Sequence, residues 1–123
     1  MNHFSPRKIL VVDDEDVIRE VLGGFLDLLG FEIENARDGA AGLAALEKSE
    51  YRAAIADVRM PKLDGLGFLR KSRRLRPNLP VVIITAHGSE EIQKEAMEAG
   101  AFAYLQKPFR YHEIKAVLNR LAD

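Results

Sequence analysis

The sequence has no cysteine, few histidines and no long apolar run, and these absences exclude several kinds of protein. Without cysteine, the chain has no disulfide, no thiol nucleophile and no thiolate metal site. Histidine is scarce as well, with three residues. The apolar runs fall well short of the roughly 18 residues that a membrane-spanning helix needs, and no apolar run marks the N-terminus as a signal peptide. We therefore expect a cytoplasmic protein with no membrane association.

The composition is that of a folded domain without a strong overall charge. Apolar residues make up 47% of the chain and charged residues 30%, which suffices both to bury a core and to stay in solution. The formal net charge of -1 gives no overall field that would draw the chain to nucleic acid or to an anionic membrane. The length of 123 residues is typical of one domain, so we expect a single domain over residues 1–123.

Five short apolar runs alternate with segments in which apolar residues recur every three or four positions. The runs predict strands, and the segments after them predict helices. The expected strands are 9–12, 32–36, 53–56, 81–85 and 103–106. Strict alternation of this kind requires right-handed crossovers and predicts an α/β fold, a parallel sheet with helices on both faces. Gly30 and Gly100 are expected to end the first and fourth helices.

Polar residues stand where several of the expected strands end. Asp13 and Asp14 follow the first strand, Asp57 follows the third, Thr85 ends the fourth and Lys107 follows the fifth. The carboxyl ends of parallel strands form the usual binding edge of such sheets. Three neighbouring carboxylates repel one another unless a cation neutralises them, and Mg²⁺ is the hard cation that oxygen ligands favour. One carboxylate is then left to act as a nucleophile in phosphoryl transfer, with the hydroxyl and the ammonium neutralising phosphoryl oxygens.

Each of these residues also has an ordinary structural interpretation. Asp13 and Asp14 are suitable helix caps, Asp57 is a suitable turn residue and Thr85 is a common strand residue. Lys107, taken alone, would be interpreted as a solvated surface charge. Their joint placement at one edge of the sheet is what favours a functional site.

Four segments together resemble response regulator receiver domains of two-component signalling. They read ILVVDDE at 9–15, DVRMP at 57–61 with DG at 64–65, ITA at 84–86 and YLQKPF at 104–109. The resemblance covers about residues 8–121. It implies a flavodoxin-like, doubly wound (βα)5 fold with strand order 2-1-3-4-5.

The resemblance also implies a magnesium site around a phosphoacceptor. Asp57 would be the phosphoacceptor and would contact the metal. Asp14 would bind Mg²⁺ directly, Asp13 would assist through water, and the backbone carbonyl of Arg59 would be a further ligand.

The remaining implied roles concern the phosphoryl group and the switch that it operates. Thr85 and Lys107 would hold the phosphoryl group, and the Lys107-Pro108 peptide bond would be cis. Thr85 and Tyr104 would form the switch, with Tyr104 swinging inward when Thr85 moves.

The partners implied are a sensor histidine kinase, a phosphotransfer protein or a small phosphodonor. The fourth helix, fifth strand and fifth helix would then control an output domain or a partner protein, and would be the most plausible surface for a homodimer. Three segments, TAHG at 85–88, EAMEAGAF at 95–102 and KPF at 107–109, are similar to receivers attached to DNA-binding output domains, which suggests transcription regulation.

Two further features have open interpretations. Arg59 and His87 lie two residues beyond Asp57 and Thr85, so they either tune the access of hydrolytic water to the phosphoryl group or are solvated rim residues. Basic residues cluster late in the expected third helix, and we interpret them as a solvated face without direct binding of nucleic acid. They are Arg70, Lys71, Arg73, Arg74 and Arg76.

Two alternative functions stay open. One is a Mg²⁺-dependent phosphohydrolase with an aspartyl nucleophile on the first strand, to which Asp14 and Asp16 superficially correspond. The other is an interaction module that works without phosphorylation.

Overall fold

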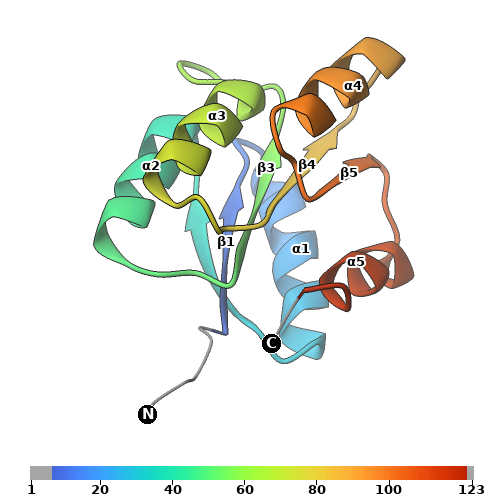
Figure 1. The fold of residues 1–123 in the computed structure, drawn as a ribbon. Helices are drawn as coiled ribbons and strands as arrows, with labels where there is room; N and C mark the ends of the chain where they lie inside the picture. The colour runs from blue at the N-terminus through green and yellow to red at the C-terminus, as the bar shows by residue number, and fades with distance from the viewer. Residues whose placement is uncertain (1–6, 122–123) are drawn as a thin grey trace.

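The computed structural model describes residues 7–121, in which five strands alternate with five helices (Figure 1). The elements are β1 (Lys8–Val12), α1 (Asp16–Leu28), β2 (Glu32–Ala36), α2 (Gly39–Lys48), β3 (Ala53–Asp57), α3 (Gly65–Leu75), β4 (Val81–Thr85), α4 (Glu90–Glu98), β5 (Ala103–Gln106) and α5 (Tyr111–Leu118). None of the helices in this part of the chain combines the length and the apolar character that a membrane span requires.

The strands form one parallel sheet in the order β2-β1-β3-β4-β5, which confirms the predicted fold class. The strand boundaries agree closely with the apolar runs. The strand β1 begins one residue earlier than expected, at Lys8, and β3 includes Asp57 as its last residue. Asp57 pairs in register with Ile84 of β4, so strand geometry fixes its backbone. The central strands β3 and β4 are buried along their whole length, as expected of strands covered on both faces.

Two apolar cores lie on opposite faces of the sheet because successive strand residues point to opposite sides. In β1, Leu10 and Val12 join the core beneath α2, α3 and α4, whereas Ile9 and Val11 join the core beneath α1 and α5. Figure 1 shows this layered arrangement. Phe68 of α3 is a fully buried large side chain of the first core. The sheet is therefore held from both sides, and its carboxyl edge is a rigid platform.

Side-chain caps fix the start of three helices on the same edge of the sheet as the strand ends. Asp38, Asp64 and Ser89 each accept a hydrogen bond from a backbone N–H three residues later, at 2.8, 2.8 and 3.1 Å. Such caps satisfy N–H groups that a helix leaves without intrahelical partners. The loops after β2, β3 and β4 therefore end in defined helix starts.

Glycines end two helices and allow one close approach of the chain. Gly30 and Gly100 have φ of +86° and +99° and follow α1 and α4, as predicted. At Gly65, an added Cβ would lie 2.2 Å from the carbonyl oxygen of Asp57. The start of α3 thus packs directly on the backbone of the strand end that carries Asp57.

The pair Gly23 and Gly24 inside α1 leads to a stability prediction. A Cβ at Gly24 would meet nothing within 4 Å apart from its chain neighbours and the backbone of its own helix, so Gly24→Ala gains helix propensity without a clash. We expect its free energy of unfolding to rise by about 0.5–1 kcal/mol in urea denaturation followed by circular dichroism. Gly65→Ala is the matched contrast, and there the close approach should lower stability by about 1–3 kcal/mol. Equal effects of the two substitutions would contradict this account.

Candidate functional site

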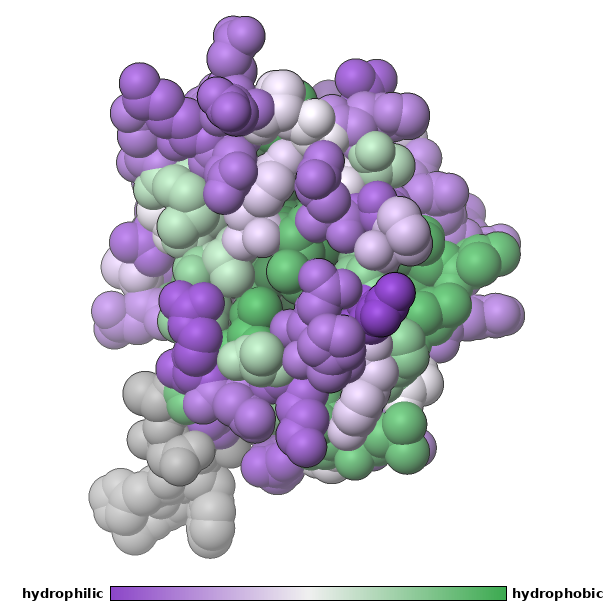
Figure 2. Space-filling model, turned by 90° about the vertical axis from the view of Figure 1, so that its right-hand side faces the viewer, coloured by the Kyte–Doolittle hydropathy of each residue, from purple (hydrophilic) through white to green (hydrophobic). Residues whose placement is uncertain are grey.

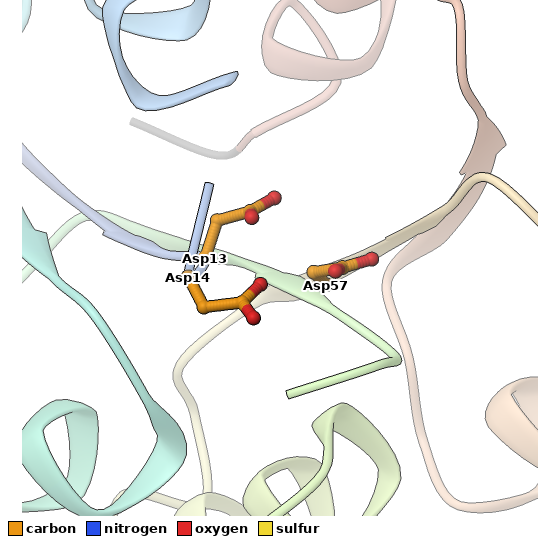
Figure 3. A group of neighbouring side chains, drawn as sticks. All are labelled: Asp13, Asp14 and Asp57. Atoms are coloured by element: carbon orange, nitrogen blue, oxygen red, sulfur yellow. The ribbon is translucent and has the colours of Figure 1, made fainter. Parts of the chain in front are cut away.

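Three carboxylates from two neighbouring strands meet at the carboxyl edge of the sheet (Figure 3). Asp13 and Asp14 follow β1, and Asp57 ends the adjacent strand β3. One oxygen of each lies within 4.8 Å of the other two. Asp13 and Asp57 are buried, whereas Asp14 is exposed. The cluster predicted from the sequence is therefore present, with one carboxylate open to solvent.

Lys107 reaches into this cluster from the loop after β5. Its Nζ lies 3.2 Å from Asp13 Oδ2 and 3.5 Å from Asp57 Oδ1. A third carboxylate oxygen, Glu15 Oε1, lies closer, at 2.9 Å. The Lys107-Pro108 peptide bond is cis, the geometry implied by the resemblance. The ammonium is shared among three acidic side chains.

The site holds more negative charge than this ammonium neutralises. Burial and, to a smaller extent, the charge of Asp13 raise the pKa of Asp57, Lys107 only partly offsets them, and the net result is a pKa of about 6. Burial also raises the pKa of Asp13, against the Glu15 backbone hydrogen bond and Lys107. Burial by itself lowers the pKa of Lys107, but the Glu15 hydrogen bond and the nearby Asp charges outweigh it and raise the pKa overall. The ionised form of Asp57 is thus held at a cost in free energy.

The donor set fits a hard divalent cation. Asp13 Oδ2 is buried and, within residues 7–121, makes no hydrogen bond, although the Lys107 ammonium is 3.2 Å away. Every candidate ligand in the cluster is a carboxylate oxygen, and oxygen is the donor that Mg²⁺ prefers. A cation placed among these oxygens would stabilise the ionised carboxylates, whose charge burial and mutual repulsion make costly.

The helix-capping interpretation of Asp13 and Asp14 is wrong. The residue in the N-cap position of α1 is Glu15, whose side chain makes no capping hydrogen bond. Asp13 Oδ1 instead accepts a hydrogen bond from the Glu15 backbone N–H at 2.9 Å. Asp16 is turned to a different partner, since its carboxylate is exposed and pairs with Arg19. Asp13 is therefore anchored inside the site, and Asp16 is not among the clustered carboxylates.

Thr85 and Tyr104 lie on one side of the cluster and are linked through Gly88. Thr85 is buried at the end of β4, next to β3, and its hydroxyl accepts a hydrogen bond from the His87 backbone N–H at 3.2 Å. A Cβ on Gly88 would lie 2.0 Å from the Tyr104 hydroxyl oxygen and 3.0 Å from Thr85 Cγ2. The Tyr104 ring packs against the core under α4, and burial raises the pKa of its hydroxyl. Tyr104 therefore already occupies an inward position.

The remaining predicted rim residues lie near these strand ends by sequence position. Arg59 follows β3 and His87 follows β4, and both residues are exposed. Pro108, also exposed, lies in a groove between α4, β5 and α5 that Lys107 and Tyr104 also line. The groove joins the edge of the site to an outer face of the molecule.

The basic cluster of α3 is partly engaged by neighbouring elements. Arg70 pairs with Glu95 of α4 at 2.5 Å, and Arg76 donates a hydrogen bond to the Leu46 carbonyl oxygen of α2 at 2.7 Å. The guanidinium of Arg73 lies against Gly100, where an added Cβ would come within 2.8 Å of its Nε. Much of this cluster ties α3 to the helices beside it.

Glu15 is the residue of the site that the sequence analysis missed. Its contact with Lys107 joins positions 92 residues apart, and no local pattern indicates such a pairing. The available signal was its place directly after Asp13 and Asp14, at the edge where Lys107 was also expected.

The sequence profile of the response regulator receiver domain family matches residues 9–119. The chain belongs to this family. Receiver domains work in two-component signalling, where they act as phosphoacceptors for histidine kinases and control output domains.

Two similar proteins show how much of a known sequence and of a known structure this chain matches. Response regulator MprA from Mycobacterium sp. (strain KMS) is 38% identical over 116 residues, which are 94% of this chain and 50% of MprA. The chain thus spans about half the length of the curated relatives it matches first. The chemotaxis protein CheY4 of Vibrio cholerae superposes with a TM-score of 0.88 at 32% identity, covering 96% of this chain and 100% of CheY4.

A second solved structure is informative about metal binding in a similar domain. The receiver domain of a sensor histidine kinase from Pseudomonas aeruginosa superposes with a TM-score of 0.86 at 29% identity, covering 95% of this chain and 98% of that one. That protein was solved with a magnesium ion coordinated in its active-site cleft.

The raised pKa of Asp57 gives a prediction for the metal-free protein. The folded state binds the Asp57 proton more tightly than the unfolded state, because the pKa rises from 3.8 to about 6. The free energy of unfolding should therefore fall as pH rises from about 4 to 6, by up to about 3 kcal/mol. Asp57→Asn should remove this loss, so that the variant is more stable than the parent at pH 8 and equally stable near pH 4.

Urea unfolding in the presence of a chelator, from pH 4 to pH 8, measures the difference in free energy of unfolding between the parent and Asp57→Asn. Asp27→Asn, at an exposed position of α1, is the control and should follow the parent. A gap between Asp57→Asn and the parent that does not change with pH would contradict the assignment.

Proposed function

We propose that residues 1–123 form a single receiver domain that is switched by phosphorylation of Asp57. The observation that carries the proposal is the buried Asp57 carboxylate with the Lys107 ammonium 3.5 Å away and two further carboxylates beside it. A histidine kinase, a phosphotransfer protein or a small phosphodonor would supply the phosphoryl group. The family membership supports these partners, and it supports a place in the cytoplasm, where such kinases present their phosphohistidine.

In the proposed reaction, a carboxylate oxygen of Asp57 forms a bond to phosphorus. With a phosphohistidine donor the P–N bond breaks, and its electron pair stays on the imidazole nitrogen, which then takes up a proton. Lys107 neutralises charge on the phosphoryl oxygens, and the Thr85 hydroxyl donates a hydrogen bond to one of them. Hydrolysis reverses the modification when a water oxygen attacks phosphorus and the bond to Asp57 breaks.

Mg²⁺ is the proposed cofactor. Asp14 and Asp57 would bind it directly, Asp13 would act through water, and the Arg59 backbone carbonyl would be the third protein ligand. The ion would supply positive charge next to the phosphoryl oxygens, which the charge excess of the metal-free cluster requires. Arg59 and His87, both exposed at the rim, are proposed to tune the access of water and thus the lifetime of the phosphoryl group.

The switch is proposed to run from Thr85 through Gly88 to Tyr104. A phosphoryl group adds about -1.5 to -2 charges and three acceptor oxygens. If Thr85 moves toward them, the packing around Gly88 changes, and with it the inward position of Tyr104. The surface of α4, β5 and α5 is the proposed readout, whether for an output domain, a partner or a second copy of the chain. Figure 2 shows that face, on which apolar surface lies between polar side chains.

The chain is similar to half of the response regulator MprA, and we propose that this domain belongs to a regulator of transcription. This domain itself is not proposed to bind nucleic acid, because Arg70 and Arg76 of the basic cluster are engaged with α4 and α2. The phosphohydrolase alternative is disfavoured by Asp16, whose carboxylate pairs with Arg19 outside the cluster.

The phosphoacceptor assignment predicts a single labile adduct. After treatment with acetyl phosphate and Mg²⁺, mass spectrometry should show one added phosphoryl group on the parent and none on Asp57→Asn. Asp38→Asn, which retains a helix cap at the start of α2, is the matched control and should be modified like the parent. A phosphoryl adduct retained by Asp57→Asn would refute the assignment.

The switch predicts that the Thr85 hydroxyl matters more for the response than for binding. Thr85→Val removes the hydroxyl and keeps the branched shape of this buried side chain. With Mg²⁺ and beryllofluoride, a phosphoryl analogue, the variant should still bind, but its amide chemical shifts in α4 and β5 should change about half as much as in the parent or less. Thr85→Ser keeps the hydroxyl and should respond like the parent. A full response of Thr85→Val would disprove this role.

A further inference from the structure

Glu15 holds the shortest of the three ionic contacts of Lys107. Its Oε1 lies 2.9 Å from the ammonium nitrogen, closer than the oxygens of Asp13 at 3.2 Å and Asp57 at 3.5 Å. The Glu15 side chain is 58% exposed, whereas those of Asp13 and Asp57 are 0% and 5% exposed. The ammonium is thus held most closely by the carboxylate at the mouth of the site.

The position of Glu15 leaves its side chain available for this contact. Glu15 stands in the N-cap position of α1, but its carboxylate accepts no capping hydrogen bond. Its backbone is fixed to the site, because its N–H donates to Asp13 Oδ1 at 2.9 Å. Because the backbone of Glu15 is anchored and its carboxylate caps no helix, the side chain can extend to Lys107.

This contact opposes the binding of an anion at Asp57. A phosphoryl group on Asp57 presents three acceptor oxygens to the ammonium. The Glu15 carboxylate holds the same ammonium by a charge-assisted hydrogen bond and repels the incoming negative charge. Because Glu15 is exposed, water can replace its contact when Lys107 turns to another acceptor.

We propose that Glu15 is a positioning residue that holds Lys107 at the mouth of the site and competes with the phosphoryl group for its ammonium. The proposal rests on the proposed role of Asp57 as phosphoacceptor. It has a second consequence for the cation. Without the Glu15 contact, Lys107 moves toward Asp13 and Asp57 and competes with the divalent ion for their oxygens. Glu15 therefore shifts the balance of the site toward the cation and away from the anion.

Three variants of the whole chain test the proposal. Glu15→Gln removes the charge of the contact, and Glu15→Asp keeps the charge but shortens the side chain by one methylene. Glu20→Gln is the matched control, because Glu20 is an exposed residue on the same helix and the substitution is the same. Titration calorimetry measures the dissociation constant of Mg²⁺ alone, and then that of beryllofluoride at saturating Mg²⁺. Circular dichroism melting checks that each variant folds.

Both Glu15 variants should bind beryllofluoride about three- to fivefold more tightly than the parent, and Mg²⁺ alone about twofold more weakly. Glu20→Gln should match the parent in both. A parental result for Glu15→Asp would show that net charge acts and not the contact, and would overturn the proposal. Equal shifts in Glu20→Gln and Glu15→Gln would overturn it as well.

The same experiment separates this inference from the function on which it rests. If the parent binds beryllofluoride no better than Asp57→Asn does, the phosphoacceptor role itself fails, and the inference fails with it. If the parent binds in a way that depends on Asp57 and the Glu15 variants do not differ from it, only the role of Glu15 fails.

Discussion

The burial of two carboxylates beside one ammonium is the constraint on which the rest of this structure depends. Asp13 and Asp57 are almost without solvent contact, and Lys107 lies within 3.5 Å of both. A buried carboxylate is costly unless charges of the opposite sign lie near it. Here burial still raises the pKa of Asp57 to about 6, so the compensation is incomplete. The site is therefore prepared to receive positive charge, and this is the physical basis of the magnesium proposal.

The fold makes that concentration of charge possible by fixing the backbones that carry it. Asp57 is held in the register of β3 against β4, and the start of α3 packs on its carbonyl oxygen at Gly65. Asp13 is held by the end of β1 and by the N–H of Glu15. The two apolar cores clamp the sheet from both sides, so the carboxylates cannot separate to relieve their repulsion.

The same rigidity explains how a change of charge would reach a distant surface. Thr85 and Tyr104 do not share a hydrogen bond that would link them directly in residues 7–121, yet both crowd the space above Gly88. In a closely packed interior, a shift of one side chain obliges its neighbour to move. Lys107 and Tyr104 line one groove between α4, β5 and α5, which brings the site and the proposed readout together. Glu15 adds a competing contact on the other side of the same lysine.

Most of the fold and much of the site could be predicted from the sequence, because both follow from local patterns. Apolar runs of the right length gave the five strands nearly to the residue, and the polar residues directly after them were expected at one edge of the sheet. The site residues Asp13, Asp14, Asp57 and Lys107 do meet there. The helix-cap alternative for Asp13 and Asp14 failed because α1 begins at Asp16, so that Glu15 and neither of them stands in the N-cap position.

The sequence by itself determined the alternation of strands and helices, the two-sided burial of the central strands and the chemical nature of the strand ends. These properties depend on periodicity and apolar content, which can be recognised in short stretches of neighbouring residues. Only the tertiary structure decided that Glu15 turns to Lys107, that Asp16 turns to Arg19 and that Tyr104 packs inward over Gly88. The direction of an unburied or half-buried side chain depends on partners that lie far away in the chain, and no local pattern contains them.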